Sequence, residues 1–256
     1  MLALASTLHD PTGVMVPLLR KTLPNIIGFY HVLAVAVTEK TSAEVKTVLA
    51  EHPNLIQVVG NHHIGDSRLN ALKGAVVDAA VQAVHYCDFD RLVHWHVNYP
   101  DELQQVLAQI QRTAGYIALG RTPRAFETHP IVQREPEYLT NRMFSWIYGE
   151  PQVVYDVVAG ACAMDRASAE FLCAHSVELS NATDCEWPML IKFSAEMPVT
   201  FIETEGLEFE TPTFFGDQVH QTSFNPDNWL NRVRLARNSI EATMRVHQQA
   251  MAQRQP

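Results

Sequence analysis

The sequence contains no run of about 18 apolar residues, the length that a membrane-spanning helix requires. We therefore expect no transmembrane segment. Its apolar start, residues 1–6, has no basic residues beside it and is interrupted soon afterwards by His9, Asp10 and Pro11. A signal peptide has a basic segment before a longer apolar one, so this start predicts a first β-strand instead.

Cysteine is scarce, and no two cysteines form a Cys-x-x-Cys pair. The four that occur are Cys87, Cys162, Cys173 and Cys185. A chain of 256 residues buries enough apolar surface to fold without disulfides. We expect reduced, mostly buried thiols and a cytoplasmic protein, and we favour this interpretation over a zinc site.

Positive charge is also in short supply. Lys and Arg number 19 against 28 Asp and Glu, which gives a formal net charge of -9. General nucleic-acid binding needs a basic surface, so we expect no nucleic-acid partner. A single phosphorylated ligand stays compatible with this balance, because a metal ion or a few arginines reverse the potential locally.

The sequence does contain an alternation of strand-like and helix-like segments. Apolar strands are expected at residues 1–6, 30–38, 55–59 and 84–87, with helical patterns between them. This order predicts one α/β domain with a mostly parallel central sheet flanked by helices. Ligands of such sheets bind beyond the carboxyl ends of the strands.

The strongest functional pattern is Asp88-Phe89-Asp90, directly after the fourth expected strand. On an extended chain, side chains two residues apart point to the same side, so both carboxylates would face one site. Carboxylate oxygens suit Mg²⁺ or Mn²⁺, which bind substrate phosphates while keeping some waters. The alternative is that the two aspartates cap a turn or the next helix.

This order of features resembles the nucleotide-diphospho-sugar transferases of the GT-A type, a glycosyltransferase superfamily with a Rossmann-like nucleotide-binding half. In that family an Asp-x-Asp follows the fourth strand, and a helix upstream of it touches the donor, as segment 65–71 would here. The resemblance implies a nucleotide-binding half at about residues 1–100 and an acceptor-side half at about 101–224. The C-terminal helix and tail would occupy 225–256, within a single domain.

The resemblance also implies roles for individual residues. Asp90 would bind the metal ion that bridges the donor diphosphate, and Asp88 would contact the ribose, or the metal through water. Asp66 would accept a hydrogen bond from the base, and Arg68 would pair with phosphate. The base and ribose would lie against the end of the first strand, at Ser6, Thr7 and His9. The alternatives are an N-cap for Asp66, a solvated helix face for Arg68 and a plain turn for His9.

Two later segments carry further candidates. Asp184 and Glu186 lie at the start of an expected helix, where the family places an acidic catalytic residue, although Asp184-Cys185-Glu186-Trp187 departs from its commoner acid–acid pair. The helix dipole alone is a competing reason for acids there. His220 would be a third metal ligand by the same resemblance, with a structural histidine as the alternative.

Arg121 and Arg124 form a basic spot in an acidic chain, and a guanidinium binds phosphate or carboxylate with two hydrogen bonds. They would hold an anionic acceptor, or else form structural ion pairs. The leading hypothesis is thus a divalent-cation-dependent glycosyltransferase that takes a nucleoside-diphosphate sugar. A nucleotide-sugar-binding protein without turnover is the main alternative, followed by an Asp-x-Asp phosphohydrolase. The amphipathic last helix leaves an oligomer open.

Overall fold

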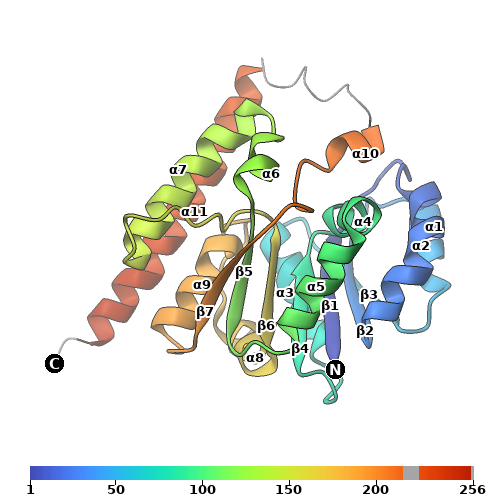
Figure 1. Cartoon of the computed structure of the whole chain (residues 1–256), viewed down its shortest axis with the longest axis horizontal. Helices are drawn as coiled ribbons and strands as arrows, with labels where there is room; N and C mark the ends of the chain where they lie inside the picture. Colours follow the sequence, from blue (N-terminus) through green and yellow to red (C-terminus); the bar gives the residue numbers. More distant parts are fainter. Residues whose placement is uncertain (216–224, 255–256) are drawn as a thin grey trace.

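The computed structural model describes residues 1–215 and 225–254, which form a single α/β domain around a 7-stranded sheet (Figure 1). The strands follow one another across the sheet in the order β3-β2-β1-β4-β6-β5-β7. Their bounds are β1 Leu2–Leu8, β2 Val32–Thr38, β3 Leu55–Gly60, β4 Ala83–Cys87, β5 Tyr116–Arg121, β6 Ala161–Asp165 and β7 Val199–Thr204.

The sheet is mostly parallel, as the sequence predicts. Strand β1 pairs in parallel with β2 and β4, β2 pairs in parallel with β3, and β5 pairs in parallel with β7. Only β6 runs against its neighbours β4 and β5. Because β1 to β4 run the same way, the turns that follow them emerge at one edge.

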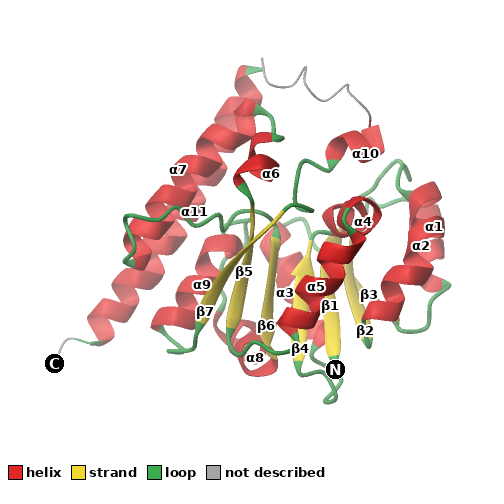
Figure 2. Cartoon of the chain, viewed as in Figure 1, coloured by secondary structure: helices red, strands yellow, loops and turns green. Residues whose placement is uncertain are grey.

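Helices cover both faces of the sheet (Figure 2). Those of the described residues are α1 Val16–Ile26, η1 Ile27–Phe29, α2 Ala43–Ala50, α3 Ile64–Ala75, α4 Phe89–Asn98, α5 Pro100–Ile110, α6 Pro123–Glu127, α7 Ile131–Tyr148, α8 Arg166–His175, α9 Thr183–Phe193, α10 Thr211–Phe215 and α11 Pro226–Gln253. Helices α1, α2, α4 and α5 pack on one face, and α3, α8 and α9 on the other. The long helix α11 lies along α7 (Figure 1).

The first strand shows why both faces are covered. Leu2, Leu4 and Leu8 enter one core, whereas Ala3 and Ala5 enter the other, because successive side chains of a strand point to opposite faces. Each fully buried leucine contributes roughly 1.5–3 kcal/mol. Such burial on both sides is typical of central parallel strands.

Three expectations about elements need correction or extension. The second strand begins at Val32 rather than residue 30, because Tyr30 caps η1 and uses its hydroxyl to contact His85. The first strand continues to Leu8. The last helix runs from Pro226 to Gln253, with Asn225 as its N-cap.

All four cysteines are free, and all but the half-buried Cys173 are buried, in agreement with the sequence. Within residues 1–215 and 225–254, no helix combines the length and apolar character needed to cross a membrane.

Candidate functional site

Asp88 lies where β4 ends and α4 begins. Its Oδ1 accepts hydrogen bonds from the Tyr86 hydroxyl at 2.6 Å and from the Thr7 hydroxyl at 3.1 Å. Its side chain makes no capping hydrogen bond, although Asp88 occupies the N-cap position. The carboxylate is therefore held by side chains of β4 and β1 at the sheet edge, and the helix-cap alternative does not describe it.

The expected extended geometry of Asp88-Phe89-Asp90 is wrong. Helix α4 starts at Phe89, so Asp90 lies in its first turn and not two places along a strand. Phe89 is fully buried, which anchors the helix start against the core. The two acids are nevertheless neighbours, because the charge of Asp88 contributes to the raised pKa of Asp90.

Asp90 lies in a crowded set of carboxylates. Burial raises its pKa to about 7, and the nearby charges of Glu210 and Asp88 add to the effect, against the opposing influence of Arg91. Arg91 also forms an ion pair with Glu210, at 3.6 Å between Nη1 and Oε2. The charges of Glu210 and Asp88 thus both act on Asp90, and a divalent cation bound there would offset their repulsion.

This chemistry fits a divalent cation held together with substrate. Among the described residues, no group of three His, Cys, Asp or Glu side chains is arranged to hold a metal ion by itself. Mg²⁺-type sites commonly use one or two carboxylates, with substrate phosphates and water completing the shell, and Asp88 and Asp90 would be the two carboxylates of such a site. The expected third ligand, His220, lies outside the described residues.

Arg68 is enclosed by partners from distant parts of the chain. Its side chain is only 5% exposed and its Nη1 binds Asp184 Oδ1 at 2.5 Å and the Thr183 hydroxyl at 3.0 Å. Its Nη2 is 3.4 Å from Asp88 Oδ2, and its guanidinium lies over the Tyr86 ring. Arg68 is therefore a buried residue and not a solvated surface residue, and it contacts Asp88 directly; its expected contact with phosphate stays a prediction.

The two acids of α9 differ in their surroundings. Burial raises the pKa of Asp184 to about 6, although Arg68 opposes this shift. Glu186 is 1% exposed, accepts a hydrogen bond from the Ser176 hydroxyl at 2.6 Å and binds Arg245 at 2.7 Å. The contact with Arg245 connects α9 to α11. Glu186 is therefore enclosed within the fold and is not accessible to a substrate.

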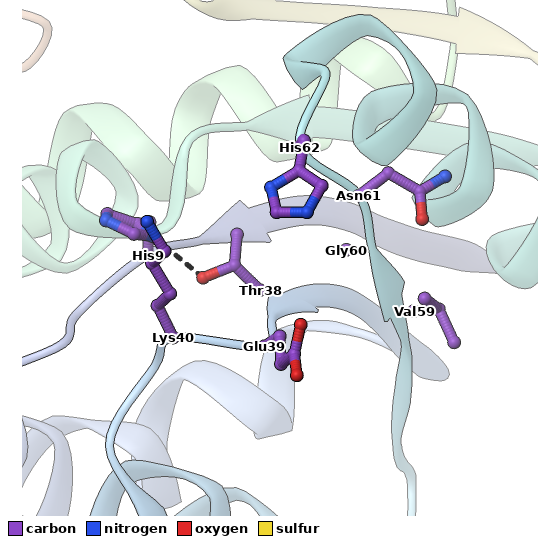
Figure 3. A pocket seen from close by; sticks show the side chains of 8 residues that line it. All are labelled: His9, Thr38, Glu39, Lys40, Val59, Gly60, Asn61 and His62. Atoms are coloured by element: carbon purple, nitrogen blue, oxygen red, sulfur yellow. Dashed lines mark hydrogen bonds between the residues drawn. The ribbon is translucent and has the colours of Figure 1, made fainter.

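A cavity of about 460 Å³ opens at the carboxyl ends of the first three strands (Figure 3). It is lined by His9, Thr38, Glu39, Lys40, Val59, Gly60, Asn61 and His62. His9 Nδ1 and the Thr38 hydroxyl are hydrogen-bonded at 2.7 Å. A smaller cavity of about 190 Å³ shares part of this lining and extends it to Thr7 and Ser67.

The sequence identified only part of this lining. His9 and Thr7 belong to it, and Thr7 joins it to Asp88. Ser6 does not, because it is fully buried and its hydroxyl donates to the Cys87 carbonyl at 2.6 Å. Asp66 lies in the first turn of α3, whose N-cap is His63, so the N-cap alternative is wrong.

The sequence analysis assigned no site role to Thr38 at the end of β2, or to the cavity residues that follow β2 and β3, namely Glu39, Lys40, Asn61 and His62. Their position at or directly after the ends of two predicted strands was the available signal, because ligands of such sheets bind beyond the carboxyl ends of the strands.

Both arginines expected at an anionic acceptor form ion pairs with the protein. Arg121 has a fully buried side chain that binds Asp156 at 2.7 Å and Glu137 at 2.8 Å. Arg124 pairs with Glu205 and with Glu208. The structural alternative therefore describes the contacts of both arginines.

Gly160 explains why a small residue precedes β6 beside Asp88. Its φ is +68°, and a Cβ atom there would lie 2.5 Å from Asp88 Oδ2. Its carbonyl also accepts the Asp88 backbone N–H at 3.1 Å. The turn thus approaches the acidic site closely, and only glycine fits both the conformation and the space.

No protein-family model and no curated protein matches this sequence. Solved structures do match. Glucosyl-3-phosphoglycerate synthase from Mycobacterium tuberculosis, in complex with Mn²⁺, UDP and phosphoglyceric acid, aligns with a TM-score of 0.58 and 12% identity, over 96% of this chain and 78% of that one. Another structure of that enzyme aligns with a TM-score of 0.62 and 10% identity, over 97% and 81%.

A third structure of the same enzyme, in complex with Mn²⁺, UDP-glucose and glycerol 3-phosphate, aligns with a TM-score of 0.55 and 11% identity, over 97% of this chain and 80% of that one. Identities this low establish the fold alone. The expected architecture is thereby confirmed: the chain has the fold of the GT-A type nucleotide-diphospho-sugar transferases.

Proposed function

We propose that this chain, which has the GT-A fold, is a divalent-cation-dependent glycosyltransferase that takes its sugar from a nucleoside-diphosphate sugar. The observation that carries the proposal is the position of Asp88. It lies beside the cavity at the ends of β1, β2 and β3, linked to it by Thr7. The complexes of the similar structures with Mn²⁺ and UDP or UDP-glucose support the same assignment.

In this proposal the larger cavity holds the base and ribose. Its volume of about 460 Å³ lies in the range of small-ligand sites, and its polar lining offers donors and acceptors to both groups. His9 and Thr38 are fixed by their mutual hydrogen bond, while Glu39 and Asn61 lie at the ends of neighbouring strands. The donor diphosphate would then extend past Thr7 toward Asp88.

Asp90 and Asp88 would hold the cation, with Mn²⁺ or Mg²⁺ as the suitable ions. When bound, the cation supplies Lewis-acid stabilisation of the charge that develops on the departing diphosphate. The protein fixes the geometry: Tyr86, Thr7 and Arg68 hold Asp88 in place before substrate arrives. Such preorganisation lowers the reorganisation needed in the transition state.

Asp184 takes part indirectly. Its carboxylate binds the Arg68 guanidinium that also contacts Asp88, so we assign it a positioning role. Glu186 is assigned to the structural connection between α9 and α11. In this proposal residues 1–100 are the nucleotide-binding half, because they include the residues that line the cavity and both aspartates.

Thermal unfolding with nucleoside diphosphates and nucleotide sugars, with and without Mn²⁺, tests this function. We expect one nucleotide to raise the melting temperature, and Mn²⁺ to increase that rise. Asp90→Asn should abolish the contribution of Mn²⁺, whereas Asp101→Asn, at an exposed position of α5, should retain it. The same rise in Asp90→Asn would refute the metal assignment. Donor binding without transfer to any acceptor would favour a non-catalytic binding protein.

A further inference from the structure

Apart from the two overlapping cavities at the ends of β1, β2 and β3, another cavity has a volume of about 320 Å³ and is called the second cavity below. It lies between the start of α7, the start of α11 and the segment before α10. Its lining includes Gln133, Phe209, Glu210, Thr211 and Arg232. None of the residues that line the two cavities beside β1, β2 and β3 belongs to it. It is a separate site of small-molecule size.

Glu210 connects this second cavity to the acidic pair. The residue is 8% exposed, and its Oε2 has no hydrogen-bond partner among the described residues beyond the 3.6 Å ion pair with Arg91. Its charge acts on Asp90, so the two carboxylates are close. Thr7 makes the corresponding connection between the first cavities and Asp88. The acidic pair therefore lies between the two binding spaces.

Arg232 gives the second cavity an accessible positive charge. Its side chain is 40% exposed, and the carboxylate with which it pairs among the described residues, that of Glu137, lies 3.8 Å away and is bound more closely by Arg121 at 2.8 Å. Arg121 itself is fully buried, and Arg91 is only 11% exposed. Of these three guanidinium groups, the one on Arg232 has the most surface open to a ligand.

The start of α7 adds to the positive potential. This helix has 18 residues, no acidic side chain in its first turn and no side-chain cap at Pro130, so the positive end of its dipole is not offset there. Arginines add to this potential at the adjacent His129, whose pKa is lowered by burial and further by the charges of Arg121, Arg91 and Arg232. An anionic group is therefore stabilised on this side of the cavity.

We propose that the second cavity binds the acceptor, and that the acceptor is a small compound with both a hydroxyl and an anionic group. This rests on the proposed transferase function. Arg232 binds the anion, a phosphate or a carboxylate, and Glu210 accepts a hydrogen bond from the hydroxyl. Arg232 thereby takes the role that the sequence suggested for Arg121 and Arg124.

The transfer step balances in this arrangement. The acceptor oxygen forms a bond to the anomeric carbon of the donor sugar, while the bond from that carbon to the diphosphate oxygen breaks. The electron pair of the broken bond leaves with the nucleoside diphosphate. The hydroxyl proton passes to the Glu210 carboxylate and from there to solvent.

Binding measurements on the full chain test the ligand class. The probes are glycerol 3-phosphate, glycerate, glycerol and inorganic phosphate, titrated calorimetrically in the presence of Mn²⁺ and the stabilising nucleoside diphosphate. We expect glycerol 3-phosphate or glycerate to bind more tightly than glycerol and than phosphate, and which of the two binds better identifies the anion. Arg232→Gln should weaken that binding about tenfold or more.

Arg234→Gln, an exposed arginine of the same helix, is the matched control and should bind like the wild type. Equal binding of glycerol and the anionic probes, absence of binding by both anionic probes, or undiminished binding in Arg232→Gln would overturn the proposal. A nucleoside diphosphate with Mn²⁺ should stabilise Arg232→Gln as it does the wild type. If it stabilises neither protein, the transferase function itself fails.

Kinetics separates the two residues once transfer is measured. Arg232→Gln should raise the acceptor KM with kcat nearly unchanged, since it acts on ground-state binding. Glu210→Gln should lower kcat about tenfold or more, because the acceptor hydroxyl loses its proton acceptor. An unchanged kcat in a folded Glu210→Gln protein contradicts the assignment of the hydroxyl contact.

Discussion

Arg68 and Asp184 form a buried ion pair, with 2.5 Å between Nη1 and Oδ1, although 116 positions separate them in the sequence. The same guanidinium reaches Asp88 through Nη2. A helix after β3 and a helix late in the chain thus jointly fix the carboxylate that follows β4. The acidic site is organised from three distant segments before any ligand binds.

Replacing Arg68 with Gln should destabilise the fold and weaken donor binding together. Removing one partner of a buried pair leaves an uncompensated charge, which costs roughly 3–5 kcal/mol. Urea unfolding measures the first effect, and titration with the stabilising nucleoside diphosphate and Mn²⁺ measures the second. Arg237→Gln, which loses only an exposed pair with Glu241, should change stability by less than about 0.5 kcal/mol. Similar losses in both variants would contradict the positioning role.

Gly160→Ala should disturb the acidic site directly. The new Cβ would lie 2.5 Å from Asp88 Oδ2 on a backbone with φ +68°, so both the turn and the carboxylate must move. We expect a stability loss of about 1–3 kcal/mol and weaker Mn²⁺-dependent nucleotide binding. Gly28→Ala is the control, because its Cβ meets nothing within 4 Å and should leave both quantities unchanged. Normal binding by Gly160→Ala would show that Asp88 needs no such fit.

His85 should make the fold sensitive to acid. It is fully buried in β4, and burial lowers its pKa to about 3. The unfolded chain binds this proton below about pH 6.5, whereas the folded chain does so only near pH 3. The contribution of neutral His85 to the free energy of unfolding is therefore complete above the unfolded pKa. It is lost as the pH falls toward the folded pKa, and the total loss is on the order of 4–5 kcal/mol.

The effect of His85 on stability is best measured by comparing the wild type with a His85 variant. The raised pKa values of Asp90 and Asp184, about 7 and 6, act in the opposite direction, because those carboxyls favour the folded state when protonated. Denaturant unfolding of wild type and His85→Gln from pH 7 to pH 4 isolates the histidine. The wild type should lose stability relative to the variant as pH falls; parallel curves would remove His85 as the cause.

Local patterns in the sequence were sufficient for the architecture. Continuous apolar runs marked the central strands, and the turns that follow them predicted one ligand edge, where His9, Thr7 and Asp88 do lie. Strand β6 was harder to interpret, because its antiparallel direction depends on pairing with β4 and β5 and not on its own residues. The alternation of side chains along a strand does not indicate whether the strand pairs in parallel or antiparallel.

The sequence by itself determined which segments form the sheet and where its polar edge lies, because side-chain periodicity and turn chemistry are local properties. Only the tertiary structure decided what the charged side chains do. The sequence suggested ligand contacts for Arg68, Arg121 and Glu186, but partners distant in the chain enclose these side chains. Two other charged residues, Glu210 and Arg232, line a cavity. Burial and pairing set the role of a charge, and both depend on contacts that a linear pattern does not contain.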